Sequence, residues 1–241
     1  WYAEPSNLHV YIDIDNGNHR TGVIAEMAEV LANKIMSSGA LILQGLHVYD
    51  GHIRISEFDK RKEMCDQHML PVVDLRKKLE RSMRSSLQLK AGGSPSFTVH
   101  AHYPDRICSP GTCIFWDYGY SQKLPDMNFE MAARVFTRIV SLPGDDLICL
   151  DLGHKAIAAE NPIGNRVYFP ALATAEPVLQ SEEHLVIRIA GGHNFKVGDS
   201  FVGIPYHVCP TVALYEEANV IDQGTIMGNW TVIARKRRIN I

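Results

Sequence analysis

The sequence has no run of about 18 uninterrupted apolar residues, the minimum for a helix that spans a membrane. Its first ten residues, WYAEPSNLHV, also lack the basic flank and apolar stretch of a signal peptide. Lysine and arginine form no long stripe and the net charge is -3, so we expect no nucleic-acid partner. The five cysteines follow no framework spacing, which is typical of a reducing compartment. We therefore expect a cytoplasmic protein with no membrane partner.

The composition is that of a folded globular protein. Of the 241 residues, 46% are hydrophobic and 21% are charged, which excludes an intrinsically disordered chain. A chain of this size can bury on the order of 28,000 Å² of surface, enough for one large domain or two small ones.

Strand and helix patterns alternate in the first half of the chain. Each apolar, β-branched segment is followed by residues at helical spacing or by a glycine-rich exit. Four strands are expected, over 8–15, 40–51, 87–94 and 107–117, with helices over 23–39 and 56–86. The second helix contains Pro71 and we expect a break before it. The strands read as apolar throughout, so the pattern favours a parallel sheet with helical crossovers, as in half of a barrel.

The pattern changes near residue 120. Beyond this point short strand-like segments and turn residues such as Pro143 and Gly144 recur at close intervals, which predicts an antiparallel β domain. We place one domain at 1–120 and the other at 121–241, joined by the linker-like segment 118–128. The expected fold class is therefore α/β followed by all-β.

Two glycine-containing clusters lie where predicted parallel strands end, which is where ligands bind in α/β folds. Gly92, Gly93 and Ser94 follow the third strand, and Gly111 and Thr112 lie within the fourth segment. Backbone amides without a Cβ obstruction, together with a hydroxyl, suit a phosphate group. Each cluster taken alone also suits an ordinary turn.

A possible metal pair lies in the segment GIPYHVCPT. His207 and Cys209 are two residues apart, so on a strand both side chains would point to one face. Imidazole and thiolate together favour zinc. The same spacing also suits a buried thiol beside a hydrogen-bonded histidine, and the spacing does not decide between these readings.

A set of motifs in this order resembles one family. The motifs are DIDNGNHRTGV (13–23), LQGLHVYDGH (43–52), LKAGGSP (89–95), SPGTCIFWD (109–117), LDLGHKAI (150–157), QSEEHL (180–185) and GDSFVGIPYHVCPT (198–211). The chain is similar over essentially its whole length to D-threonine aldolase and D-serine dehydratase-like proteins. These are pyridoxal-phosphate enzymes of fold type III, the alanine racemase-like group, in which an eight-unit (β/α) barrel precedes a β domain.

The resemblance implies roles for the cofactor residues. Arg20 would contact the phenolic-oxygen side of pyridoxal 5'-phosphate, and Tyr49 would lie against its pyridine ring. The glycine clusters would hold the phosphate through Gly92, Gly93, Ser94, Gly111 and Thr112.

The resemblance also implies a metal site, an acid/base group and a partner. His207 and Cys209 would be the metal pair of the β domain, holding zinc or, alternatively, manganese or magnesium. His154 falls where racemases of this fold place an acid/base tyrosine. Family members are typically homodimers, so a homodimer is expected.

Two departures from the family pattern matter. The Schiff-base lysine of the family lies on the first barrel strand, and neither Lys90 nor Lys155 matches that position. We therefore expect the chain to be the carboxyl-terminal portion of an enzyme of about 350 to 400 residues, carrying the last four βα units of the barrel and inactive alone. Cys108 and Ser109 stand where racemases carry an arginine to the pyridine nitrogen, which disfavours racemisation.

The expected function is a metal-assisted, pyridoxal-phosphate-dependent lyase acting on β-hydroxy D-amino acids. An aldolase would release glycine and an aldehyde, whereas a dehydratase would release an oxo acid and ammonia. A racemase of the same fold and a non-catalytic fragment that binds phosphate ligands remain as alternatives.

Overall fold

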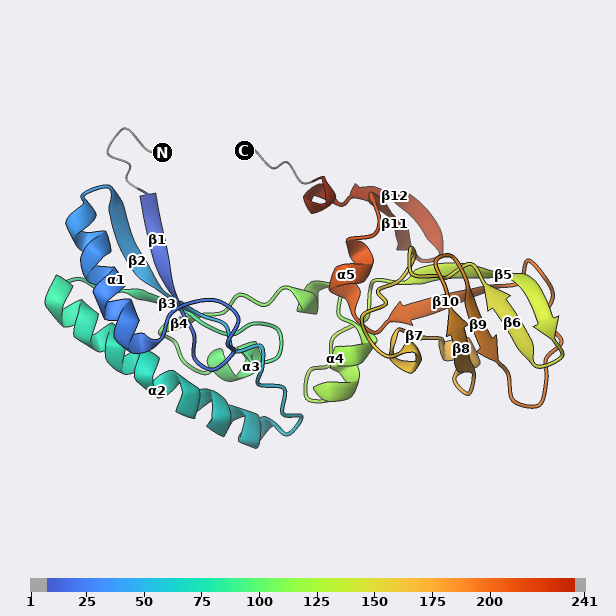
Figure 1. Cartoon of the computed structure of the whole chain (residues 1–241), viewed down its shortest axis with the longest axis horizontal. Helices are drawn as coiled ribbons and strands as arrows, with labels where there is room; N and C mark the ends of the chain where they lie inside the picture. The colour runs from blue at the N-terminus through green and yellow to red at the C-terminus, as the bar shows by residue number, and fades with distance from the viewer. Residues whose placement is uncertain (1–7, 237–241) are drawn as a thin grey trace. The chain divides into compact units, whose positions relative to one another are not determined.

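The computed structural model describes residues 8–236, which form two compact units (Figure 1). Unit 1 comprises the described residues up to 113 together with 123–127. Unit 2 comprises 114–122 together with the described residues from 128 onward. Each unit has its own hydrophobic core.

Unit 1 is built on a parallel sheet with helical crossovers, as the alternating pattern predicted. Its four strands pair in sequence order, β1-β2-β3-β4, and every pairing is parallel. The elements are β1 (Leu8–Ile14), α1 (Ala25–Ser38), β2 (Leu41–Val48), α2 (Phe58–Met83), β3 (Gln88–Lys90), α3 (Phe97–His100) and β4 (Arg106–Ile107).

The two long helices follow from their apolar spacing. Helix α1 buries Ala28, Ala32 and Ile35 and ends at Gly39, whose left-handed φ of 66° is the usual conformation for a glycine after a helix. Helix α2 continues through Pro71, so the predicted break is wrong. The residues buried by α2 recur every three or four positions on both sides of the proline, and this stripe holds the helix in one piece: Cys65, Met69, Val72, Leu75 and Leu79.

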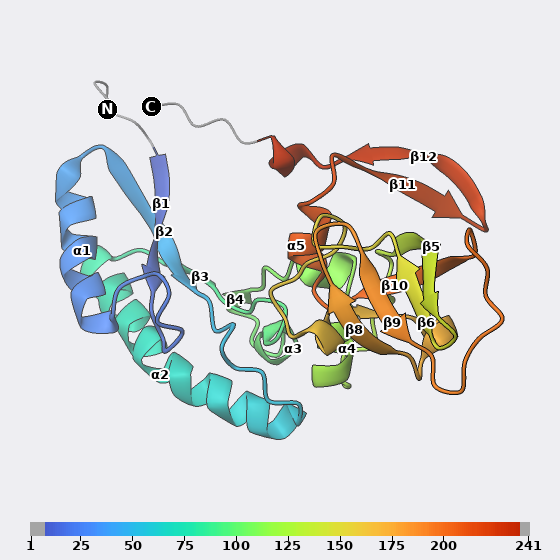
Figure 2. The same cartoon turned by 45° about the vertical axis from the view of Figure 1, so that its right-hand side comes forward.

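The two faces of the sheet in unit 1 differ, which corrects the expectation of strands that are apolar throughout. Alternate strand residues, including Ile12 and Leu46, belong to one core cluster with residues of α1 and α2, and Figure 2 shows both helices beside β1 and β2. The opposite face is polar. His47 Nδ1 lies 2.6 Å from an Asp13 carboxylate oxygen, and Lys90 Nζ lies 4.0 Å from the ring centroid of Tyr11. Apolar and polar side chains therefore alternate along these strands, because the helices cover only one face of the sheet.

The fourth predicted strand is much shorter than expected. Only β4 (Arg106–Ile107) pairs with β3, and the rest of 107–117 forms a loop and the 3-10 turn η1 (Thr112–Ile114). The physical reason is Pro110, which has no amide hydrogen for a sheet ladder, and the adjacent Gly111. The short helix α4 (Tyr118–Lys123) follows.

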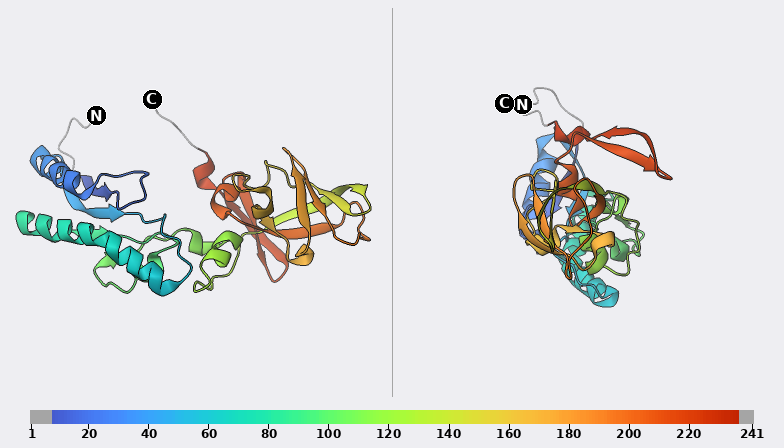
Figure 3. Two further views of the ribbon diagram at one scale, coloured as in Figure 1. Left: turned by 60° about the horizontal axis from the view of Figure 1, so that its bottom comes forward. Right: turned by 90° about the vertical axis from the view of Figure 1, so that its right-hand side faces the viewer.

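Unit 2 is an antiparallel β structure, as predicted for the second half. Its six-stranded sheet has the order β7-β10-β5-β6-β9-β8, and β11 and β12 form a separate hairpin (Figure 3). The strands are β5 (Val135–Gly144), β6 (Leu147–Leu150), β7 (Val167–Tyr168), β8 (Glu176–Gln180), β9 (Leu185–Arg188), β10 (Ser200–Pro205), β11 (Glu217–Asp222) and β12 (Thr225–Thr231). Between them lie η2 (Ile163–Asn165), η3 (Pro170–Leu172), α5 (Val208–Val212) and η4 (Ile233–Arg235).

The core of unit 2 comes from the inward positions of its central strands, with Ile139, Ile148, Leu150 and Ile187 almost fully buried. Among the described residues, no helix is long and apolar enough to cross a membrane.

Candidate functional site

Two predicted cofactor residues meet at the carboxyl ends of β1 and β2. The guanidinium carbon of Arg20 lies 4.5 Å from the ring centroid of Tyr49, a contact of the cation-π type. The chain before Arg20 is held by Asp15, whose Oδ1 accepts the Gly17 N–H at 3.0 Å and the His19 N–H at 2.9 Å. These backbone hydrogen bonds lower the pKa of Asp15 to about 2, so the carboxylate is charged near neutral pH.

The ring of Tyr49 also touches the first glycine cluster. A Cβ placed on Gly93 would lie 2.3 Å from Tyr49 Cε2, so only glycine allows this approach. Gly92 adopts a φ of +91°, a conformation that L side chains rarely adopt. The turn after β3 therefore carries its two glycines for different reasons, one for the packing of Tyr49 and one for backbone conformation.

The second glycine cluster lies against the first. The Thr112 N–H donates to Ser94 Oγ at 3.0 Å, and the Ser109 N–H donates to the Gly92 carbonyl at 3.1 Å. Gly111 lies in the same loop, where a Cβ would meet nothing within 4 Å. The structure thus brings the residues with predicted cofactor roles into one cluster at the ends of the parallel strands.

The chemistry of this cluster fits a pyridoxal phosphate. Ser94 is buried, and its hydroxyl retains donor capacity while it accepts from Thr112, because a hydroxyl carries one donor and two acceptor sites. A guanidinium, an aromatic ring, hydroxyls and glycine backbone, buried at Gly92 and Gly93 and exposed at Gly111, match the phenolic oxygen, the pyridine ring and the phosphate of that group.

His207 and Cys209 lie close together, but not on a strand. Strand β10 ends at Pro205, His207 is the residue before helix α5, and Cys209 lies in the first turn of that helix. The expectation that a strand pairs them was wrong, because β10 ends before His207 and helix α5 begins between the two residues. Hydrogen bonding to Cys209 and to Glu160 raises the pKa of His207 to about 9, although partial burial opposes the rise.

Two acidic residues that sequence reasoning missed support this pair. Glu160 Oε1 lies 2.5 Å from His207 Nδ1, and no motif in the sequence marked this glutamate. Asp117, 1% exposed, accepts the Val208 N–H at 3.1 Å and so fixes the start of α5. The sequence offered one indication of Asp117, namely its position as the last residue of the motif SPGTCIFWD.

The loop that carries Glu160 is tied to α5 as well. Thr211 Oγ1 donates to the His207 carbonyl at 2.8 Å and accepts the Ala158 N–H at 3.2 Å. A histidine that donates Nδ1–H to a carboxylate can bind a metal through Nε2 once the Nε2 proton is lost, and such carboxylates commonly orient metal-binding histidines. The donor set therefore fits a divalent ion, with His207 and Cys209 as ligands.

The acid/base candidate His154 is exposed and lies beside Arg166, whose Nη1 is 3.3 Å from His154 Nε2. Because arginine can only donate, this nitrogen of His154 acts as the acceptor. The His154 amide donates to the Ser181 carbonyl at 2.9 Å, which fixes its backbone. The role of His154 in proton transfer stays a prediction.

Neither lysine considered in the sequence contacts the cofactor residues. Lys90 Nζ lies over the Tyr11 ring, and Lys155 pairs with Glu182 at 2.7 Å and Glu183 at 3.1 Å. The latter contacts account for the polar QSEEHL motif as an exposed ion-pair cluster.

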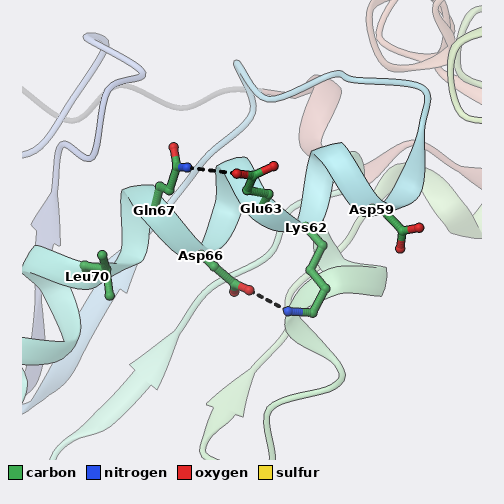
Figure 4. Close-up of a pocket in the computed structure, with 6 residues that line it drawn as sticks. All are labelled: Asp59, Lys62, Glu63, Asp66, Gln67 and Leu70. Atoms are coloured by element: carbon green, nitrogen blue, oxygen red, sulfur yellow. Dashed lines mark hydrogen bonds and ion pairs between the residues drawn. The ribbon is translucent and has the colours of Figure 1, made fainter.

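A shallow hollow of about 500 Å³ runs along α2. Figure 4 shows that its lining side chains all come from this helix, with Lys62 paired to Asp66 at 2.5 Å. The lining residues are Asp59, Lys62, Glu63, Asp66, Gln67 and Leu70. None of the predicted site residues belongs to this hollow, whose one lysine, Lys62, is already paired with Asp66.

The amino-acid sequence is similar to one protein family model and to a D-threonine aldolase. Residues 132–221 match the family model described as "Putative serine dehydratase domain". A D-threonine aldolase of Arthrobacter sp is 26% identical over 242 residues, covering 95% of this chain and 62% of that protein.

Solved structures share the fold. The D-threonine aldolase from Filomicrobium marinum matches with a TM-score of 0.85 and 22% identity, over 95% of this chain and 63% of that chain. The D-threo-3-hydroxyaspartate dehydratase from Delftia sp. HT23 matches with a TM-score of 0.73 and 17% identity, over 92% and 65%. The chain thus spans less than two thirds of the length of these relatives. These comparisons confirm the resemblance that the motifs predicted: the chain is similar to D-threonine aldolase and D-serine dehydratase-like proteins and shares the alanine racemase-like fold.

Proposed function

We propose that this chain is part of a metal-assisted, pyridoxal-phosphate-dependent lyase that acts on β-hydroxy D-amino acids. The observation that carries the proposal is the contact of Arg20 with Tyr49 in unit 1, where the ring also packs on Gly93. The relatives support the same class, since their names include D-threonine aldolase and D-threo-3-hydroxyaspartate dehydratase.

The cofactor would be held by unit 1. Arg20 would neutralise the phenolic oxygen and Tyr49 would support the pyridine ring, while the two glycine clusters would bind the phosphate through backbone amides and the hydroxyls of Ser94 and Thr112. When bound, pyridoxal phosphate supplies an electron sink for charge that develops at the substrate Cα. Contact with Tyr49 would restrict the motion of the pyridine ring.

The metal would be held by His207 and Cys209 in unit 2, with Glu160 orienting the imidazole through Nδ1. A divalent ion supplies Lewis-acid activation of a β-hydroxyl group. Zinc suits a thiolate and an imidazole best, with manganese and magnesium as alternatives. A metal role is supported by one structural neighbour, a cysteine-to-alanine mutant of D-threo-3-hydroxyaspartate dehydratase in the metal-free form.

We propose that these residues form the carboxyl-terminal portion of a barrel, with the Schiff-base lysine outside them. The chain alone is then expected to be inactive, and the complete protein to be a homodimer. His154 is proposed to move a proton at Nε2, where Arg166 now donates.

The test uses the protein expressed from its full reading frame, supplied with D-threonine or D-serine in the presence and absence of a chelator. Glycine with an aldehyde indicates an aldolase, and an oxo acid with ammonia indicates a dehydratase. Appearance of the L-enantiomer alone would select a racemase, and no product from any substrate would favour a non-catalytic phosphate-binding module. We expect lyase products that the chelator abolishes.

A matched pair of variants tests the metal ligands. Cys209→Ala is expected to lower bound metal at least 10-fold and to remove the lyase products. Cys149→Ala, on β6, is the control and is expected to keep both. Equal metal content in the two variants would contradict the assignment.

A further inference from the structure

A buried polar network lies directly behind the candidate cofactor cluster in unit 1. Asp50, Ser96 and His100 are each 0% exposed. One carboxylate oxygen of Asp50 accepts the Ser96 hydroxyl, and the other lies 2.6 Å from His100 Nε2. Arg106 Nη1 contacts the remaining ring nitrogen, His100 Nδ1, at 2.9 Å. The network therefore joins three segments of unit 1. Asp50 follows β2, Ser96 and His100 lie at the two ends of α3, and Arg106 begins β4.

The hydrogen bonds of this network have a fixed direction. Arginine has no acceptor, so Arg106 must donate and His100 Nδ1 must accept. His100 then carries its proton on Nε2 and donates it to Asp50. Burial raises the pKa of Asp50, but the hydrogen bonds from His100 and Ser96 outweigh burial and hold that pKa below its ordinary value. The Asp50 carboxylate is therefore charged and accepts hydrogen bonds from the Ser96 hydroxyl and from His100 Nε2–H.

The same place offers a possible metal site, which the hydrogen bonds argue against. Ligand atoms of Asp50, Cys65 and His100 all lie within 4.8 Å of one another. However, a histidine bound to a metal through Nε2 would need a proton on Nδ1, the atom that accepts from Arg106. Burial and the nearby Asp50 carboxylate also raise the pKa of the Cys65 thiol, which disfavours the thiolate that a metal requires.

The network is connected to both parts of the cofactor cluster. Asp50 directly follows Tyr49 in the chain, and Ser96 belongs to the turn that begins at Gly92. Within that turn, the Ser96 and Phe97 amides donate to the Gly93 carbonyl at 3.1 and 2.9 Å. A hydroxyl bond from Ser96 to Asp50 therefore links the strand end that carries Tyr49 to the turn that carries the phosphate glycines.

We propose that Asp50, acting through Ser96 and His100, is a positioning residue that fixes the turn of Gly92, Gly93 and Ser94 for the phosphate of the cofactor. This inference rests on the proposed function, because it assigns the turn to that phosphate. The physical reason is preorganisation: a turn held before binding loses less conformational freedom when it binds a ligand.

The experiment measures binding of pyridoxine 5'-phosphate by calorimetry, because this ligand keeps the ring and phosphate but has no aldehyde to react with surface lysines. Ser96→Ala is the main variant and Asp50→Asn the second, while Ser82→Ala, exposed on α2, is the matched control. Hydrogen exchange of the amides in 91–97 is followed in the absence of ligand. We expect Ser96→Ala to weaken binding at least 10-fold and to speed exchange in 91–97, with unchanged exchange in β1 and with the control unaffected.

The outcomes separate the two proposals. No binding by the unmodified protein would overturn the proposed function itself. Normal binding by Ser96→Ala would overturn the positioning role and leave the proposed function intact. Faster exchange throughout unit 1 would also overturn it, since the network would then support the whole unit and not this turn. If Asp50→Asn fails to fold, Ser96→Ala decides the question, because it removes one hydroxyl and leaves the hydrogen bond between His100 and Asp50 in place.

Discussion

Replacement of Gly93 by alanine tests the close packing at the centre of the cofactor cluster. An alanine Cβ would lie 2.3 Å from Tyr49 Cε2 and 2.9 Å from Cδ2, whereas carbon atoms in contact are normally separated by about 3.5–4.0 Å. The ring has to move by roughly an ångström or more. Its opposite edge already lies against Gly51, where a Cβ would be 2.3 Å from Tyr49 Cε1, so retreat in that direction displaces further atoms.

Overpacking of this kind costs about 1–3 kcal/mol of unfolding free energy. The matched control is Gly111→Ala, because a Cβ there meets nothing within 4 Å and the backbone is not left-handed. Urea denaturation followed by far-ultraviolet circular dichroism suits the question, since both long helices, α1 and α2, belong to unit 1. With a slope of about 2 kcal/mol/M, a loss of about 2 kcal/mol lowers the midpoint by about 1 M.

The two glycine variants should therefore differ in both stability and binding. Gly93→Ala is expected to unfold at lower urea and to bind pyridoxine 5'-phosphate more weakly, because Tyr49 is displaced. Gly111→Ala is expected to keep the midpoint of the unmodified protein within about 0.25 M, corresponding to about 0.5 kcal/mol. Equal midpoints for the two variants would show that Tyr49 does not pack on Gly93 as described, and the reasoning would be refuted.

Three further changes test other parts of the fold. Pro71→Ala restores an amide donor inside α2 and should raise the unfolding free energy by roughly 1–3 kcal/mol in urea titrations, whereas a loss would mean that the proline is needed for the helix path. Asp117→Ala leaves the Val208 amide without its buried acceptor and should cost about 1–3 kcal/mol, which equilibrium unfolding measures; an unchanged midpoint would contradict the capping role. Burial raises the pKa of Asp151, but hydrogen bonds led by the Arg138 amide outweigh it and lower that pKa, so its stabilising effect is present above the unfolded value near 3.8 and is lost as pH falls. The melting temperature of Asp151→Asn should therefore decrease less between about pH 5 and 3 than that of the unmodified protein. An equal decrease in both proteins would mean that other groups cause the loss of stability in acid.

The strength of the sequence patterns explains which elements could be predicted. Apolar residues at helical spacing identified α1, and its end at Gly39 was visible because a left-handed residue after a helix is usually glycine. The parallel order of β1, β2 and β3 followed from strand and helix alternation. The fourth strand was overpredicted because Ile107 and Ile114 resemble strand residues locally, while Pro110 between them removes a ladder donor.

The candidate site also has a part that the sequence could predict and a part that it could not. Glycine clusters and the His207–Cys209 spacing are local features, so the sequence alone marked them as candidates. Their neighbours were not visible, because Asp50 and His100 are separated by 50 residues and Glu160 and His207 by 47. No short-range pattern encodes a hydrogen bond between such distant positions.

The sequence by itself determined the order of helices and strands, the change from α/β to antiparallel β structure and the family resemblance, because these depend on residue spacing and on ordered motifs. Only the tertiary structure decided which groups meet: Tyr49 against Gly93, Ser94 with Thr112, and Asp50 with Ser96 and His100. The physical reason is that spacing fixes the side of an element on which a residue lies. The partner across the core is chosen by the packing of whole elements, which brings distant segments together.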